Sequence, residues 1–377
     1  MHPIHPPANA ASPRPNLLRR ALGAAAAALA LAFAAAPAAH AQTACDADIN
    51  ADGTVGAPDL AALLGAWGAC SGCASDVNND GFVNAADLSA LLGLWGGTCQ
   101  PVPWATVLDF APDPAVVTNG SLRKAIAATG LPWRVRDNAT QIEMLLVPSG
   151  TFNMGCSAST QSGCFSDENP VHAVTLTNAF YIGRYEVTQA QWTAKMGSNP
   201  SGFQSASLEV PAAQVPNRPI ETVSWNTIQG FLSATGLRLP TEAEWEYAHR
   251  AGTTTAFHSM PRFPSGTNED NQVGNIGWFT SNSVSQTRPV GGKAANALGL
   301  HDMSGNVFEW VNDWYSSTYY ASSPSTNPPG PTTGALRVLR GGSWSVGAGN
   351  LRSSYRDFVS APGNSSDVIG FRVARAP

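Results

Sequence analysis

Charged side chains are scarce in this sequence. Asp, Glu, Lys and Arg make up 12% of its 377 residues, whereas an ordinary globular chain has about 25%. Gly and Pro are numerous, with 36 and 28 residues, yet they stay below the roughly 25–30% that marks low-complexity disorder. Hydrophobic residues reach 43% and include 11 Trp, which is enough for a sizeable core. The composition excludes a disordered chain, a coiled coil and a basic nucleic-acid binder, and it favours a loop-rich fold with little regular helix.

Apolar runs long enough to span a bilayer are also absent beyond the N-terminal region. There, Arg14, Arg19 and Arg20 precede the apolar run 21–36, and small residues stand before Ala41. This pattern predicts a secretory signal peptide, residues 1–41, cleaved after Ala41. A transmembrane anchor is the alternative, but the run is short, rich in Ala and followed by polar sequence. We therefore expect a secreted or extracytoplasmic protein, at the cell surface or in the periplasm.

Positive charge is the minority sign. Removal of the predicted signal peptide leaves 18 basic and 26 acidic residues, a formal net charge of −8. This balance argues against DNA, RNA or anionic membrane surfaces as partners.

Cysteine occurs six times, always after the predicted cleavage site. Export permits disulfides, and an even count in two clusters suggests three bridges whose connectivity the sequence leaves open. The cysteines are Cys45, Cys70, Cys73, Cys99, Cys156 and Cys164.

A duplicated loop occupies the beginning of the predicted mature chain. Residues 45–68 and 73–96 match at an offset of 28, with 15 identities in 24 positions. Oxygen-bearing side chains at positions 1, 3, 5 and 12, a carbonyl at position 7 and Gly at position 6 are the pattern of an EF-hand calcium loop. A metal-free Asx turn is the alternative, and two copies in phase disfavour it. The predicted calcium ligands are Asp48, Asn50, Asp52, Thr54 and Asp59 in the first copy, and Asp76, Asn78, Asp80, Phe82 and Asp87 in the second.

Each loop is followed by leucines and a tryptophan at helical spacing, which predicts one helix per copy. The pair resembles dockerin domains, the calcium-dependent docking modules of extracellular bacterial complexes. We therefore interpret 42–99 as a small all-α dockerin-like domain. Its partner would be a cohesin-like or cell-surface receptor, although packing on its own main domain and surface retention stay open. The repeat symmetry suggests the disulfides Cys45–Cys70 and Cys73–Cys99.

The rest of the chain divides into a linker, 100–130, with a short helix at 121–126, and a main domain, 131–377. Short apolar runs predict strands at 144–147, 337–339 and 370–373. Capping-box patterns at Thr188 and Thr241 predict the starts of two helices. His249 ends the second helix, where a cation is favourable. These short elements between Gly- and Pro-rich stretches predict an α+β domain.

Seven motifs in the main domain occur in the order of a known family. They include Val147-Pro148-x-Gly150-Thr151-Phe152, Arg238-Leu239-Pro240-Thr241-Glu242-Ala243-Glu244-Trp245, Gly305-Asn306-Val307-Phe308-Glu309-Trp310 and Arg340-Gly341-Gly342-Ser343-Trp344. Together they resemble the formylglycine-generating (sulfatase-modifying factor) enzyme family. The resemblance implies a C-type-lectin-like fold, rich in loops and stabilised by calcium.

The same resemblance implies where catalytic residues would stand. In the copper-dependent oxidases of the family, two cysteines follow the Arg-Gly-Gly-Ser motif, because soft thiolates select Cu(I). Here Val346 and Leu351 occupy those positions, so copper is not expected, no catalytic residue is assigned, and Ser343 is expected to hold a turn. The four main-domain histidines form no ligand pair at helical spacing, and Gly-x-Ser-x-Gly does not occur, so neither an iron site nor a Ser hydrolase is supported.

One main-domain metal site is implied by the resemblance. Asp302, Gly305, Val307 and Glu309 match family positions that bind calcium through side-chain and carbonyl oxygens, and we expect a structural role for it.

Two functional hypotheses remain. The first is a non-oxidase binding module, a pseudoenzyme that binds an unknown protein, peptide or glycan and is anchored by its dockerin-like domain. The alternative is an active formylglycine-generating or related oxidoreductase that acts on protein cysteine with a non-standard metal site.

Overall fold

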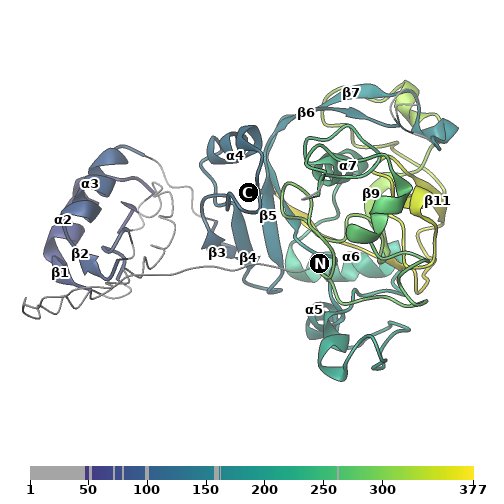
Figure 1. Ribbon diagram of the computed structural model, residues 1–377, viewed down its shortest axis with the longest axis horizontal. Coiled ribbons are helices and arrows are strands. Elements are labelled where there is room, and N and C mark those ends of the chain that lie inside the picture. The colour runs from purple at the N-terminus through teal and green to yellow at the C-terminus, as the bar shows by residue number, and fades with distance from the viewer. Residues whose placement is uncertain are drawn as a thin grey trace, which may run out of the picture. The chain divides into compact units, whose positions relative to one another are not determined.

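The computed structural model describes residues 47–50, 53–70, 73–78, 80–97, 102–156, 161, 163–260 and 263–377 (Figure 1). The predicted signal peptide lies outside the described residues, as do Cys45, Asp52 and Cys99. Within the described ranges, no helix combines the length and hydropathy needed to cross a membrane.

The duplicated segment forms two similar loop–helix units. Helix α2 spans Ala57–Gly65 and helix α3 spans Ala85–Gly93, and the short strands β1 (Gly68–Ala69) and β2 (Phe82–Val83) pair antiparallel. The helix predicted after each loop is therefore present. The equivalent Leu63 and Leu91 are both fully buried in one small apolar cluster.

The disulfides differ in part from those predicted. Cys70 bonds to Cys73, with Cα atoms 5.9 Å apart, so the predicted Cys45–Cys70 and Cys73–Cys99 bridges are wrong. The symmetry argument failed because the two cysteines flank the junction between the copies, close enough in sequence to reach bonding distance locally. Cys156 and Cys164, the second cysteine cluster, bond to each other.

The larger sheet of the main domain has five antiparallel strands in the order β13-β8-β5-β4-β3. These are Ala374–Arg375, Phe180–Gly183, Glu143–Val147, Arg134–Asp137 and Ala105–Asp109. The edge strand β3 comes from the segment interpreted as a linker and pairs with β4. That part of 100–130 thus belongs to the sheet, because its hydrogen-bonding groups find a partner strand that local sequence does not reveal.

A second sheet has the strand order β11-β10-β9-β12, and a separate hairpin pairs β6 with β7. These strands are Asp357–Ser360, Arg337–Arg340, Phe308–Trp314 and Ile369–Gly370, with the hairpin formed by Gly150–Met154 and His172–Leu176. The strand predicted at 370–373 is wrong, because only Gly370 belongs to β12. Residues 371–373 form no strand, since here the chain passes from the second sheet to β13 of the larger one.

Helix α4 (Gly120–Ala127) lies in the segment interpreted as a linker, where a short helix was predicted. The described residues of the main domain add α5 (Gln189–Met196), α6 (Trp225–Thr235) and α7 (Glu242–Arg250). Thr188 and Thr241 cap α5 and α7 in capping boxes, as predicted. Helix α6 was missed, although its Ser224 cap and Gly236 terminator are visible in the sequence. Short 3₁₀ turns lie at Ser166–Glu168, Ala212–Asn217, Asp270–Asn275, Tyr319–Ala321 and Ala348–Leu351.

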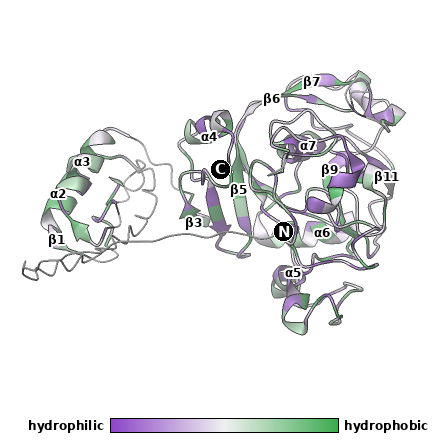
Figure 2. Cartoon of the chain, viewed as in Figure 1, coloured by the Kyte–Doolittle hydropathy of each residue, from purple (hydrophilic) through white to green (hydrophobic). Residues whose placement is uncertain are grey.

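Helix α7 is hydrophilic in sequence yet lies in the interior (Figure 2). Its buried Glu246 faces Arg340 of β10 at 2.5 Å, and Glu242 accepts from Arg356 at 2.6 Å. The main domain is therefore a mixed fold with few helices and small sheets, held by buried ion pairs as well as by apolar packing.

Candidate functional site

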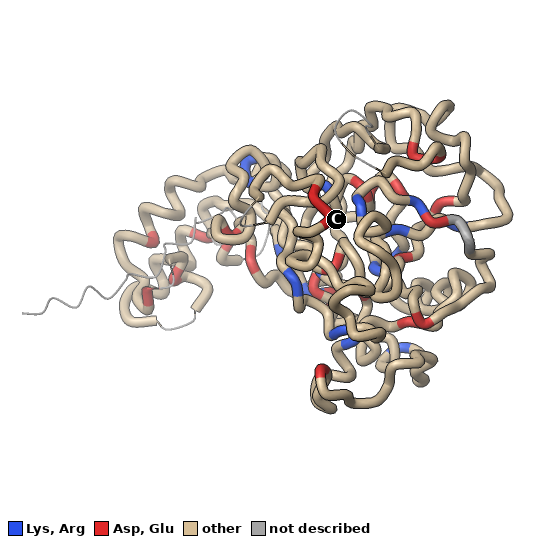
Figure 3. The backbone as a smooth tube through the Cα atoms, turned by 45° about the vertical axis from the view of Figure 1, so that its right-hand side comes forward, with Lys and Arg blue, Asp and Glu red and all other residues tan. Residues whose placement is uncertain are grey.

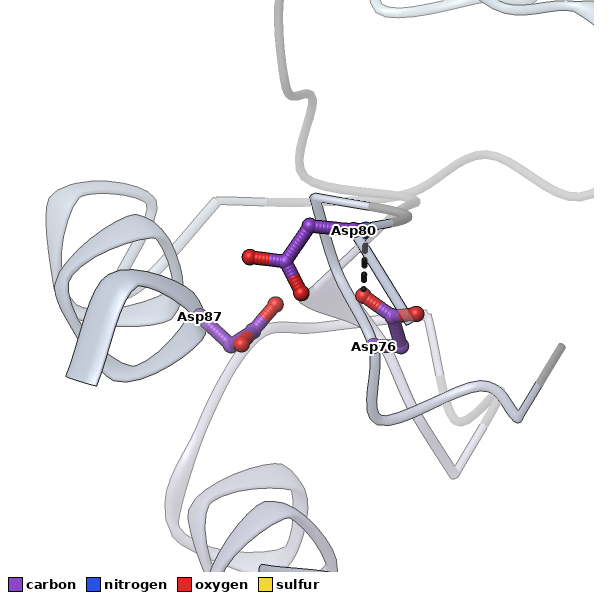
Figure 4. A group of neighbouring side chains, drawn as sticks. All are labelled: Asp76, Asp80 and Asp87. Carbon is purple, nitrogen blue, oxygen red and sulfur yellow. Dashed lines mark hydrogen bonds between the residues drawn. The ribbon is translucent and has the colours of Figure 1, made fainter. Parts of the chain in front are cut away.

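The second loop of the duplicated segment gathers three carboxylates. Oxygens of Asp76, Asp80 and Asp87 lie within 4.8 Å of one another (Figure 4). Asp76 accepts from the backbone N–H of Asp80 and of Gly81, at 3.1 and 2.8 Å. Asp87, fully buried, accepts from the N–H groups of Asn78 and Asn84. The backbone therefore orients these acids toward one point.

The first loop repeats this arrangement at the equivalent residues. Asp48 accepts from the N–H of Gly53 at 2.9 Å, and Asp59 accepts from Asn50 at 3.0 Å. Gly53 and Gly81 share a φ of 90°, a left-handed conformation that glycine adopts at low cost. The two loops thus have the same local geometry where both are described.

The chemistry of this segment suits a hard cation. Residues 42–99 contain seven Asp and no Lys, Arg, His or Glu, and Figure 3 marks the acidic positions in red. Converging carboxylates without a basic neighbour repel one another unless a cation or a proton intervenes. Calcium takes such oxygen ligands. Ligation by these side chains, and by the carbonyl groups of Thr54 and Phe82, remains a prediction.

In the main domain, the motif from Asp302 to Glu309 forms a tight turn. Asp302, Gly305 and Asn306 all have positive φ, of 55°, 92° and 65°. A Cβ atom at Gly305 would lie 2.3 Å from the carbonyl oxygen of Trp278. This close backbone contact explains why the motif carries glycine there.

Glu309 forms a buried ion pair with Arg372. Its carboxylate binds the Arg372 guanidinium through two hydrogen bonds, at 2.6 and 2.7 Å, and accepts a third from Trp245 Nε1 at 2.7 Å. Both Glu309 and Arg372 are fully buried. Because this pairing already neutralises the carboxylate, Glu309 fits a structural ion pair better than an open calcium ligand.

Asp302 is the residue of this motif that has a carboxylate oxygen free to bind a further group. Its Oδ2 accepts from the N–H of Gly291 at 2.6 Å, while its buried Oδ1 has no hydrogen-bond partner. Burial raises the pKa of Asp302 to about 6. A cation or a proton bound at Oδ1 would remove the free-energy cost of this buried oxygen without a partner. The calcium site with the ligands Asp302, Gly305, Val307 and Glu309 stays a prediction. Of these four residues, Asp302 supports it.

Glu186 is a buried acid beside this motif that the sequence interpretation missed. It accepts from Asn306 Nδ2 at 2.7 Å and from the N–H of Val307 at 3.0 Å. Its pKa lies well above the ordinary value, chiefly because it is buried and also because Asp302 and Glu309 are near. Tyr185-Glu186-Val187-Thr188 is another of the seven family motifs, and the position of Glu186 in it was the available signal.

The segment after Arg340 carries the two substituted positions. Leu351 is fully buried in an apolar cluster with Phe257 and Ile276, and Val346 packs against the same cluster. The hydroxyl groups of Ser343 and Ser345 lie 3.2 Å apart, consistent with the expected turn. The side chains of Val346 and Leu351 contain no atom that binds copper.

Three partly exposed aromatic residues surround this segment, and we call Phe203, Trp278 and Trp344 the aromatic face. Trp344 packs edge-on against Phe203, with ring centroids 5.4 Å apart. The Arg288 guanidinium lies 5.0 Å from the Trp278 ring centre. The N–H of Trp344 donates to Asn306, whose own N–H donates to Trp278. The Trp344 ring is also held by its Nε1, which donates to the Asp367 carbonyl at 3.0 Å.

A serine and a histidine also lie next to Leu351. His249 Nε2 is 2.9 Å from Ser304 Oγ, and this hydroxyl donates to the Leu351 carbonyl at 3.1 Å. The imidazole must then donate to Ser304, so it is not a base for that hydroxyl. Burial lowers the pKa of His249 well below its usual value, and the expectation of a helix-terminal cation at His249 is wrong.

Residues 134–377 match the sulfatase-modifying factor enzyme 1-like domain. The chain belongs to this family. Relatives in the family carry different names. The formylglycine-generating enzyme of Streptomyces coelicolor is 32% identical, over 66% of this chain and 93% of that protein. The serine/threonine-protein kinase pkn1 of Chlamydia caviae is 33% identical over 62% of this chain, and the chain matches only 38% of the length of that relative.

Among solved structures, Treponema denticola variable protein 1 is similar, with a TM-score of 0.55 and 30% identity. The match covers 63% of this chain and 95% of that protein. The family and its fold are therefore established, whereas the activity has to be argued from the site.

Proposed function

We propose that this chain is an exported, non-oxidase member of the family that binds a ligand or partner through its main domain and is anchored by a dockerin-like calcium module. The observation that carries the proposal is the fully buried, aliphatic Leu351, with Val346 beside it, at the positions of the family's copper-binding cysteines. Without thiolates, the segment has no soft ligand for Cu(I).

The aromatic face supports a binding role. Phe203, Trp278 and Trp344 are each partly exposed, and aromatic side chains contribute much of the binding energy at recognition sites. The contact between Phe203 and Trp344 and the hydrogen bond from Trp344 Nε1 to Asp367 restrict these rings, which reduces the entropy that binding would cost.

The duplicated loops support anchoring. The carboxylates of Asp76, Asp80 and Asp87 would hold one calcium ion in the second loop, and the first loop would hold another through the equivalent residues. Leu64, Trp67, Leu92 and Trp95 are each about half exposed, at 52, 51, 52 and 48%. Large apolar side chains repeated on the surface suit a docking partner. Export itself is supported by the disulfides, which form in oxidising compartments.

The direct test is mass spectrometry. Protein from residue 42 onward is incubated with copper, oxygen, a reductant and a sulfatase-type peptide that contains cysteine. We expect no conversion of that cysteine to formylglycine beside an active control enzyme. Conversion would establish the alternative, an oxidoreductase with a non-standard metal site, which the 32% identity to a formylglycine-generating enzyme favours.

Binding is tested with the same protein. A Trp344→Ala variant should lose most of its retention on glycan or cell-wall material, whereas Leu208→Ala should keep it. Leu208 is 99% exposed and lies outside the aromatic face. Equal retention of both variants would remove the aromatic face from the proposal.

A further inference from the structure

A cavity of about 330 Å³ opens between the β6 hairpin strand and the C-terminal end of α7. Leu122, Val147, Pro148 and Leu298 contribute apolar lining. It shares no lining residue with the segment 341–351 or with the aromatic face. Its volume is at the low end of small-ligand sites, which hold about 300–1,000 Å³.

One wall of the cavity is aromatic. The rings of Phe152 and Tyr247 lie with centroids 5.2 Å apart at an interplanar angle of 48°. Gly150 makes room for them, because a Cβ atom there would stand 2.3 Å from the Tyr247 hydroxyl oxygen. Any larger residue at 150 would displace the phenol from this wall.

Neutral polar groups line the rest of the cavity. Asn153, Thr253 and Thr254 contribute to its lining. The hydroxyl of Tyr247 has no hydrogen-bond partner among the described residues. Asn153 alternates with Phe152 along β6, so its amide lies on the face of the hairpin opposite Tyr247. Burial raises the pKa of Tyr247, so the phenol keeps its proton and can both donate and accept.

The cavity lining offers no unpaired charged side chain to a ligand. Arg250 is the one charged residue among those that line the cavity, all of which the structure describes. Its guanidinium lies 2.8 Å from the Glu246 carboxylate and donates to the Gly155 carbonyl at 2.8 Å. The Arg250 side chain is only 3% exposed. A charged ligand would therefore be desolvated without a partner.

We propose that this cavity binds one neutral, hydroxylated ring, the pyranose residue of a glycan. The apolar C–H face of the ring would pack on Phe152 and Tyr247, and its hydroxyl groups would bond with the Tyr247 hydroxyl. Binding here does not depend on the chemistry at the Ser343–Leu351 segment, so this proposal and the proposed function fail or succeed separately.

Ligand-observed saturation-transfer NMR on the full chain tests the site with the methyl glycosides of glucose, galactose and N-acetylglucosamine. We expect saturable, millimolar binding of at least one glycoside and at least tenfold weaker binding of glucuronate. Tyr247→Phe and Phe152→Leu should each weaken glycoside binding at least fivefold. The matched control Asn364→Ala, an exposed residue outside the cavity, should not change it.

Thermal unfolding checks that each variant is folded, and Phe152→Leu keeps the test decisive if Tyr247→Phe unfolds. Three results would each overturn the proposal: no glycoside binds, glucuronate binds as well as the glycosides, or the folded variants bind like the wild type.

Discussion

Gly305 shows how one residue secures the Asp302–Glu309 turn. It adopts a φ of 92° and leaves no space for a Cβ atom against the backbone of Trp278. We expect Gly305→Ala to lower the free energy of unfolding by about 2–4 kcal/mol, because it adds backbone strain and a clash. Urea unfolding measures this. Gly347→Ala, with open space around its Cβ position and a φ of −78°, is the control and should change little.

His258 is a buried histidine whose protonation would lower the stability of the folded protein at acidic pH. Its side chain is inaccessible, its Nδ1 lies 2.7 Å from the carbonyl of Ser259, and its Nε2 has no partner. Burial lowers the pKa of His258 from 6.5 to about 4. Between these two pH values the unfolded chain binds more protons than the native protein, so stability falls as the pH drops from 6.5 to 4.

We expect this histidine to contribute a loss of about 3 kcal/mol on acidification from pH 7 to pH 4. His258→Asn keeps a donor to Ser259 without the titration, so its unfolding free energy should fall less over that range. Asp302 and Asp313, whose pKa values burial raises to about 6 and about 8, act in the opposite direction in both proteins. Identical pH profiles for variant and wild type would contradict the assignment.

At the scale of elements, the helix termini were the most predictable features. Thr188 and Thr241 cap α5 and α7 with the partners that the sequence indicated, because a cap involves only three or four neighbouring residues. The strand β3 was missed because its identity depends on pairing with β4, more than twenty residues away. Its sequence has no property that distinguishes it from a linker.

The loop before α3 is the element on which the calcium prediction rests. We expect calcium to raise the melting temperature of the wild-type protein relative to chelator, because a ligand that binds only the native state stabilises it. Asp80→Ala should lose at least half of this increase by scanning calorimetry.

Asp270→Ala, which removes an exposed acid of the main domain, should retain the calcium effect. A wild-type melting temperature that is the same with calcium and with chelator would contradict calcium binding by the duplicated loops.

At the scale of the whole molecule, buried ion pairs join segments that are far apart in the chain. Arg340 pairs with Glu246 and donates to the carbonyl groups of Ser353, Ser354 and Tyr355. Removing Arg340 would leave Glu246 with Arg250 as its remaining ion-pair partner and would take a buried donor from three carbonyl groups, both of which cost free energy in the interior.

We expect Arg340→Met to lower the free energy of unfolding by about 3–5 kcal/mol. The control is Arg136→Met, whose side chain is 41% exposed and pairs with Glu143 at 3.1 Å, and it should cost less than about 1 kcal/mol. Similar losses for both variants in urea unfolding would show that the interior pairs contribute no more than the surface pair.

The sequence by itself determined the family, the duplicated loops and the capped helices, and it has Val346 and Leu351 where the resemblance implies cysteines. Each of these depends on residue identity or on spacing within a few turns of chain. The tertiary structure alone decided that Glu309 pairs with Arg372, that His249 is a neutral donor and that Gly150 makes room for Tyr247. These features depend on which distant segments meet and on how much water they exclude, and short-range spacing does not encode either.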